Sequence, residues 1–320
     1  MRFPDGLTDE DGWLSTPLDE PAPVFVHGLH RSGTTWLYAL LSKRFGLAPV
    51  TVWHVFFYPR LLARGVTDRA LLDGHFAKLG LKDRQIDGIA LSHATVEEVG
   101  WLLQKHGGSP RIDDRTDRLF RNLDRKLRTL SPGVPGTVYK NPWEVGRAAK
   151  LSARFSAAKF VFIRRDPVRL LQSQLRNALL FAQDAVYLDL LLDGFARGRA
   201  AMGAQRSLLR FAGEAAYTRV MLAVLTRDIA HNLVAYQRDL AATPAHRRVE
   251  VAYADLVEQP GEVLQRVGEF LQLPDLQPHV QAVPTPRNIA IPTRLESHFA
   301  AFASDLDRRG LGVPARERGL

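Results

Sequence analysis

The chain has 320 residues, of which 46% are hydrophobic and 24% charged, as in a soluble globular protein with a sizeable core. It contains no cysteine, which excludes disulfides, thiolate catalysis and thiolate-ligated metal sites. The net charge of +9 favours an anionic partner, either a nucleic acid, a membrane surface or a polyanionic small molecule, unless the arginines form a merely solvated surface.

The N-terminal segment is acidic and rich in proline. Residues 1–23, MRFPDGLTDEDGWLSTPLDEPAP, lack the basic and apolar regions of a signal peptide. No run of about 18 apolar residues occurs in the chain. We therefore expect an extended arm over residues 1–21, no membrane partner and a cytoplasmic location. The abundance of Ala, Leu and Arg favours a bacterial source.

Short β-branched or apolar runs alternate with longer helical patterns along the rest of the chain. Unalternated runs separated by helices are typical of a parallel sheet covered on both faces. The sequence therefore predicts the α/β class, as a three-layer sandwich with a central parallel sheet and a single domain over residues 1–320. The predicted strands are Val24–His27, Val50–Trp53, Ile89–Leu91, Thr137–Tyr139, Phe160–Ile163 and Val249–Val251.

Helical patterns follow the first and the fifth of these runs. The first helix is predicted over Thr34–Phe45, where apolar residues recur at helical spacing. Asp166 before Pro167 is typical of an N-cap followed by proline at the first helical position, so a second helix should run to about Phe181. The stretch Tyr187–Leu240 has no strand signal, and it predicts a helical lid or subdomain over about residues 187–240.

The segment PVFVHGLHRSGTTWLYALL, residues 23–41, is a strand, a short loop and a helix. Gly28 and Gly33 have the spacing of a P-loop, and Thr34 and Thr35 stand where its lysine and hydroxyl residue would be. Glycine lets the backbone approach a ligand closely. Backbone N–H groups and the helix N-terminus can then surround an anion, so the loop predicts a phosphate site.

The loop departs from that of a nucleotide phosphotransferase. Thr34 replaces the lysine that a nucleoside triphosphate requires, and the loop's cation is Arg31. Arg164 and Arg165 follow the run at 160–163, where a kinase would place a carboxylate for Mg²⁺. This pattern predicts a metal-free site suited to a sulfonate donor.

The motif HRSGTTW resembles the 5′-phosphosulfate loop of the sulfotransferases that use 3′-phosphoadenosine-5′-phosphosulfate (PAPS). The resemblance covers roughly residues 22–300. It implies that Arg31 contacts the leaving phosphate and bridging oxygen, and that Trp36 stacks on adenine. The residues that it implies around the 5′-phosphate are Ser32, Gly33, Thr34 and Thr35.

The segment KFVFIRRDPVRLLQSQLRNAL, residues 159–179, resembles the 3′-phosphate motif of the same family. That motif has an arginine at a strand end and a serine eight residues later, the spacing of Arg165 and Ser173. An arginine fork binds phosphate bidentately. Arg164 is the rival for the arginine role.

Two further positions follow from the resemblance. The segment VYKNPW resembles a lysine-containing strand end, which implies that Lys140 stabilises charge at the transferring sulfonate. The loop VPTPRNIAIPTR lies where members close over the nucleotide, which makes Arg287 a candidate contact there.

Transfer to a hydroxyl or amine also requires a general base. One branch of the family places a histidine two residues after the lysine, but Pro142 occupies that position. Other branches carry the base a little over twenty residues after the loop, where His54 is the titratable residue of APVTVWHVFFYPR. We therefore predict His54 as the base, against the alternative of a core histidine.

The alternative candidates for the general base lie in the segment LSHATVEEVGWLL. They are His93, Glu97 and Glu98. Thr95 and Glu98 fit a capping box, which favours a structural role for Glu98 and leaves Glu97 as a second catalytic candidate.

The resemblance implies a sulfotransferase with PAPS as co-substrate, 3′-phosphoadenosine-5′-phosphate (PAP) as product and no metal. The expected acceptor is a small molecule or carbohydrate, with a partly apolar alcohol or phenol favoured by the residues of Phe56–Leu81 and Tyr187–Leu240. A homodimer stays open. The rival functions are a P-loop kinase, a nucleic-acid-binding protein and a non-catalytic nucleotide sensor. The arginines are spread along the chain rather than blocked, which disfavours nucleic acid.

Overall fold

Five parallel strands form the sheet of the described residues, in the order β2-β3-β1-β4-β5. The computed structural model describes residues 10–14, 21–63, 65–85, 88–183, 185–276, 295–314 and 317. The strands are β1 (Val24–His27), β2 (Ala48–Pro49), β3 (Thr137–Lys140), β4 (Lys159–Arg164) and β5 (Arg248–Ala252).

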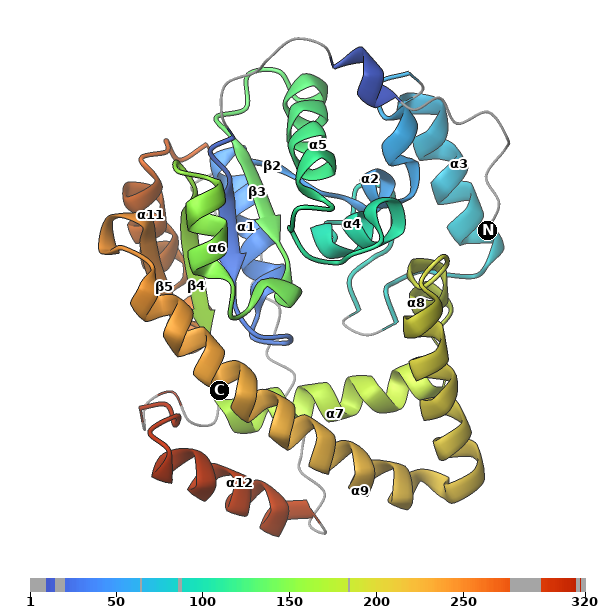
Figure 1. The fold of residues 1–320 in the computed structure, drawn as a ribbon, viewed down its shortest axis with the longest axis vertical. Helices are drawn as coiled ribbons and strands as arrows, with labels where there is room; N and C mark the ends of the chain where they lie inside the picture. Colours follow the sequence, from blue (N-terminus) through green and yellow to red (C-terminus); the bar gives the residue numbers. More distant parts are fainter. Residues whose placement is uncertain are drawn as a thin grey trace.

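Helices cover both faces of this sheet (Figure 1). The principal ones are α1 (Thr34–Phe45), α2 (Val52–Phe57), α3 (Gly65–Lys78), α4 (Val99–Gly107), α5 (Asp117–Leu130), α6 (Ala148–Arg154), α7 (Pro167–Gln183), α8 (Val186–Leu191), α9 (Ala196–Ala242), α10 (Tyr253–Glu258), α11 (Pro260–Leu271) and α12 (Glu296–Arg308). Short 3-10 helices are η1 (Glu10–Trp13), η2 (Tyr58–Arg60), η3 (Pro142–Glu144) and η4 (Ala245–Arg247).

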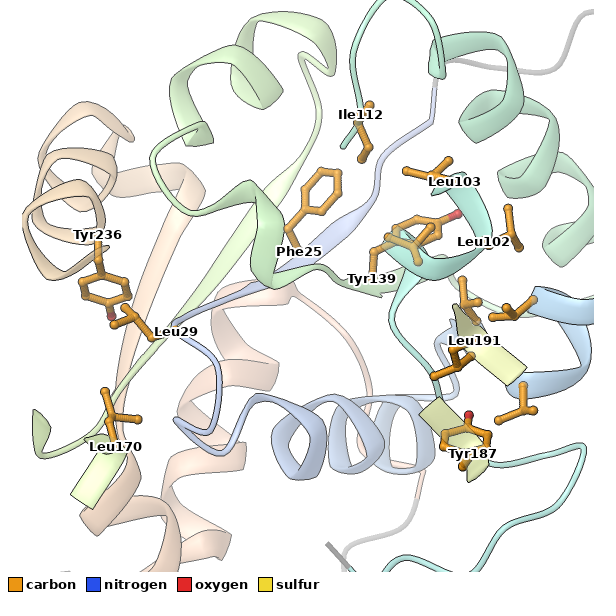
Figure 2. Close-up of a cluster of buried hydrophobic side chains, with 14 of the residues drawn as sticks. Phe25, Leu29, Leu102, Leu103, Ile112, Tyr139, Leu170, Tyr187, Leu191 and Tyr236 are labelled. Carbon is orange, nitrogen blue, oxygen red and sulfur yellow. The ribbon is translucent and has the colours of Figure 1, made fainter. Parts of the chain in front are cut away.

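The side chains of β1 alternate between two hydrophobic clusters. Val24 and Val26 lie in the cluster that includes residues of α1 and α11. Phe25 lies in the other cluster, with its ring 5.5 Å from that of Phe160 and 6.0 Å from that of Tyr139 (Figure 2). Because successive residues of a strand point to opposite faces, the sheet is buried on both sides, which confirms the α/β class and the three layers.

Four predicted strands are confirmed as β1, β3, β4 and β5, and two are wrong. Val50–Trp53 is the start of α2, because Thr51 is its N-cap and exchanges hydrogen bonds with the first turn. Ile89–Leu91 forms only an isolated antiparallel bridge at Ala90, outside the sheet. Within the predicted N-terminal arm, Glu10–Trp13 form η1.

The predicted helices follow the structure closely. Asp166 caps α7, since its Oδ1 accepts a hydrogen bond from the N–H of Val168 at 3.0 Å. The stretch 187–240 is helical, as α8 and α9, and α9 is kinked at Gly213, where φ is 80° and ψ is 168°. Although α9 has 47 residues, neither it nor any other helix in the described ranges is apolar enough to cross a membrane.

A buried hydrogen bond between two side chains fixes the far end of α9 to the sheet. Asp239 Oδ2 lies 2.8 Å from Nε2 of His27, the last residue of β1. The same carboxylate accepts hydrogen bonds from the N–H groups of Gly146, Arg147 and Ala148 at 2.5, 3.1 and 3.0 Å. This end of α9 is therefore held directly beside the loop that follows β1.

Candidate active site

A cavity of about 430 Å³ opens at the carboxyl edge of the sheet. It is lined by residues that end or directly follow four of the strands, including Arg31 after β1, Lys140 of β3, Arg165 after β4 and Tyr253 after β5. In an open parallel sheet, ligands bind at this edge, where connections leave the central strand in opposite directions.

The loop after β1 needs glycine at two positions. A Cβ on Gly28 would lie 2.7 Å from the carbonyl oxygen of Ile163. A Cβ on Gly33 would collide with the ring of Tyr253, and its φ of 93° lies in the left-handed region. Gly33 is the N-cap of α1 and offers no side chain to the first turn, so the N–H groups there can serve an anion. Arg31 also has a positive φ, 70°, which is strained for a non-glycine residue.

The two predicted phosphate motifs meet in the structure. Arg31 Nε donates to Ser173 Oγ at 3.0 Å, and Arg165 Nη1 donates to the carbonyl oxygen of Arg31 at 3.0 Å. Burial lowers the pKa of Arg165, but a guanidinium stays charged. Its Nε is buried and has no hydrogen-bond partner among the described residues, so it is available to donate a hydrogen bond to an anionic ligand.

Arg164, the rival arginine, does not line the cavity. Its guanidinium pairs with Glu317 at 2.6 Å and with Glu250 at 3.8 Å. The geometry therefore favours Arg165 over Arg164 for a ligand contact.

Aromatic rings flank this cationic group. The guanidinium carbon of Arg165 lies 4.2 Å from the ring centroid of Tyr253. Trp36 meets the same ring edge-on, with centroids 6.3 Å apart, and both rings line the cavity. Tyr253 was not among the predicted site residues. Its position directly after β5, beside β4, was the available signal.

Lys140 connects the loop to a carboxylate. Its Nζ donates to Thr35 Oγ1 at 2.7 Å and to Glu98 Oε1 at 2.5 Å. Both Lys140 and Glu98 are buried, yet both line the cavity. Glu98 is the N-cap residue of α4, so the predicted capping box from Thr95 to Glu98 is wrong. The helix begins after Glu98, and the carboxylate of Glu98 accepts the hydrogen bond from Lys140 instead of capping the helix.

Charges around Glu98 determine its protonation. Burial alone would raise the pKa of Glu98, but Lys140 above all, with His30 and Arg84, outweighs burial and holds that pKa below its usual value. His30, a loop residue that prediction missed, lines the cavity and meets Trp143 edge-on at 5.8 Å. Desolvation lowers the pKa of His30, and Lys140 and Arg31 act in the same direction, against the opposing influence of Glu98.

Glu97 lies directly behind this group. Its Oε1 accepts a hydrogen bond from the N–H of Glu98 at 2.9 Å and lies 3.6 Å from Arg84 Nη2. Its Oε2 accepts from the hydroxyl of Tyr187 at 2.5 Å. Glu97 does not line the cavity, whereas Arg84 and Tyr187 do.

His54 is not brought to the cavity. Its Nδ1 accepts a hydrogen bond from the N–H of Thr51 at 2.9 Å, so the lone pair that a base would use is occupied. Burial, with the nearby charge of Arg69, lowers the pKa of His54 to about 3. His93 also lies outside the lining and pairs with Asp73 at 2.5 Å.

The end of the cavity away from the loop is apolar. Phe56–Leu81, expected to contribute, supplies core residues such as Phe57 and Phe76 but no residue of the cavity lining. Arg287 lies outside the described residues. The apolar lining comes instead from α4, α7, α8 and α9, as Trp101, Phe181, Tyr187, Leu188, Leu191, Leu192 and Met202.

Comparisons with known proteins agree with this architecture. A sequence profile of the sulfotransferase family matches residues 23–278. No curated protein matches the chain. A sulfotransferase from Mycobacterium avium superposes with a TM-score of 0.57 at 16% identity, over 93% of this chain and 78% of that one. A sulfotransferase from Mycobacterium tuberculosis H37Rv superposes with a TM-score of 0.53 at 19% identity, over 80% of this chain and 68% of that one. At these identities the two structures show a shared fold.

Proposed function

Because this chain belongs to the sulfotransferase family, we propose that it transfers the sulfonate group of PAPS to a hydroxyl or amine of an acceptor and releases PAP. The observation that carries the proposal is the convergence of both phosphate motifs on one cavity, through the Arg31–Ser173 and Arg165–Arg31 contacts. We further propose that residues 1–320 form a single domain, with α8 and α9 on the acceptor side.

The donor would lie along the carboxyl edge of the sheet. The first turn of α1, with Ser32, Gly33, Thr34 and Thr35, would hold the 5′-phosphate. Arg165 and Ser173 would hold the 3′-phosphate, since a guanidinium fork suits a phosphate. Trp36 and Tyr253 would enclose the adenine, and the lack of a Cβ on Gly33 leaves room for the Tyr253 ring.

Glu98 replaces His54 in this proposal as the general base. It lines the cavity and is ionised at neutral pH, because Lys140 holds its pKa low. Glu98 would take the proton of the acceptor hydroxyl as the acceptor oxygen bonds to sulfur. Lys140 and Arg31 would stabilise the negative charge that develops on the sulfonate and on the leaving phosphate oxygen. Glu97, through the N–H of Glu98, would position that carboxylate.

The apolar end of the cavity supports an acceptor with a substantial apolar part, such as an alcohol, a phenol or a glycoside. Its lining residues of α8 and α9 supply aliphatic and aromatic contacts and no carboxylate. A cationic group is therefore disfavoured on the part of the acceptor that occupies that end.

Calorimetric titration with PAP tests the donor site, with ADP as the matched control and EDTA in both. We expect PAP to bind more tightly, because ADP lacks the 3′-phosphate that Arg165 would contact. Arg165→Met should remove the preference, whereas Arg164→Met should keep it. Equal affinity for both nucleotides, or a Mg²⁺ requirement for binding, would contradict the proposal and favour a kinase.

A further inference from the structure

The outer face of α9 carries a regular stripe of exposed residues after the Gly213 kink. Its members are separated by four, three, four, three and four positions, and all are exposed. We call this stripe the α9 seam. It consists of Val220, Val224, Arg227, His231, Val234 and Arg238.

This spacing gathers the six side chains on one side of the helix. At about 100° per residue they fall within a sector of about 80°, over a length of about 27 Å. Alternating steps of three and four are the pattern by which one helix packs along another. A solvent-facing stripe is usually polar throughout. Here Val220, Val224 and Val234 are 44%, 53% and 44% exposed.

The C-terminal part of the seam lies in a groove. A cavity of about 1160 Å³ includes four of its members, Arg227, His231, Val234 and Arg238, and Val220 and Val224 continue the stripe along α9 beyond it. One wall comes from α12, which runs beside α9 in Figure 1 and is tied to it by a hydrogen bond from Gln237 Nε2 to the carbonyl oxygen of Gly310 at 3.3 Å. The other wall is the turn at Val145 and Gly146, with Arg111.

The groove is strongly basic. Its charged lining residues are five arginines and two aspartates. One of the aspartates, Asp305, pairs with Arg309 at 2.9 Å. Within the part of the chain that the structure describes, Arg227 and Arg238 make no ion pair. They lie eleven residues apart, about 16 Å along the helix.

We propose that this groove binds an acidic, amphipathic α-helix of a partner protein, laid along the α9 seam. The three valines would meet its apolar stripe, and Arg227 and Arg238 would meet its carboxylates. A second copy of this chain fits poorly, since its own seam offers no carboxylate to pair with Arg227 and Arg238. The mixture of valine and arginine also favours a helix over an anionic glycan, which offers no apolar stripe.

The groove adjoins the active-site cavity. Arg111 Nε donates to the carbonyl oxygen of Trp143 at 3.2 Å, and the indole of Trp143 packs on His30. Asp228, which lines the groove, acts electrostatically on the same His30. A helix bound on the seam would thus lie beside the part of the active-site cavity that His30 lines.

Two labelled reporter peptides test the proposal with the full chain. Both are 21-residue helices with leucine at the heptad a and d positions, and one carries glutamate and the other lysine at e and g. Fluorescence anisotropy at low salt should show the glutamate peptide binding at least about tenfold more tightly. The double variant Arg227→Glu/Arg238→Glu should invert this order. The control Lys150→Glu/Arg210→Glu, with the same charge change outside the groove, should not.

Equal binding of the two peptides, or equal behaviour of the seam and control variants, would overturn the proposal. Binding of a heparin fragment, lost in the seam variant while neither peptide binds, would identify an anionic glycan instead and also overturn it. A concentration-dependent dimer in sedimentation velocity that only the seam variant abolishes would place a second copy there. Circular dichroism melting confirms that both variants fold.

Discussion

Replacement of Glu98 by glutamine separates its role as a base from its role as a partner of Lys140. The carboxylate accepts a hydrogen bond from Lys140 Nζ at 2.5 Å. The glutamine oxygen can accept the same hydrogen bond, so Lys140 and Thr35 should keep their places. The variant loses basicity while the geometry is retained.

The expected loss follows from what a positioned base contributes. General-base catalysis typically accelerates a step by about 10²–10⁴-fold, so kcat of Glu98→Gln should fall by about that factor. The matched variant Glu97→Gln should lose much less, because Glu97 does not line the cavity. His54→Asn should keep kcat within about threefold, since asparagine can still accept the hydrogen bond from Thr51.

The assay is PAP release at saturating PAPS, with a panel of alcohols and phenols as acceptors, followed across pH. The pKa of Glu98 lies below its usual value, so wild-type kcat should stay level at neutral pH and fall only in acid, as the carboxylate becomes protonated. Glu98→Gln should lack that acid limb. Near-normal turnover in Glu98→Gln, or a large loss in His54→Asn alone, would refute the assignment of the base.

Lys140→Met should lower kcat by about 10²–10³-fold while PAP affinity stays within about threefold in calorimetry, because the ammonium serves mainly the developing charge. Gly33→Ala should weaken PAP binding by at least about tenfold, since the left-handed φ of 93° and the contact with Tyr253 both oppose a Cβ; unchanged affinity would contradict this account of the loop. Acidification from pH 7 to pH 5 should cost about 2 kcal/mol of unfolding free energy through His54, because the unfolded ring takes up a proton near its ordinary pKa of 6.5 whereas the buried ring, with a pKa of about 3, does not. His54→Asn should remove that part of the slope in urea unfolding, and an unchanged slope would show that another group is responsible.

Much of the fold could be predicted because local signals and burial agree. The runs that became β1, β3 and β4 are buried on both sides, and such strands need no alternation to be recognised. The run that became β5 lies at the edge of the sheet and is only partly buried. Val50–Trp53 misled the prediction because an apolar run is compatible with either structure until the hydrogen bonds of Thr51 are known.

The candidate site was predictable where one local motif holds the chemistry, as in the loop around Arg31 and at Arg165 and Ser173. The proposed base was not, because that proposal depends on which side chains the tertiary structure turns toward Lys140. Glu98 and His54 both carry suitable groups. Only the tertiary structure shows that Glu98 lines the cavity, whereas the His54 ring accepts a hydrogen bond from the backbone N–H of Thr51.

The kink at Gly213 divides α9 into two helical segments with different contacts. We call residues 196–212 the near rod and residues 214–242 the far rod. The far rod is fixed at Asp239, which pairs with His27 directly before the phosphate loop. The near rod, residues 196–212, supplies Met202 and Gln205 to the apolar end of the cavity. Substitutions in the near rod can therefore alter the proposed acceptor end of the cavity without disturbing the anchored rod. If that end binds the acceptor as proposed, acceptor preference can be redesigned in this chain while the loop after β1 is left unchanged.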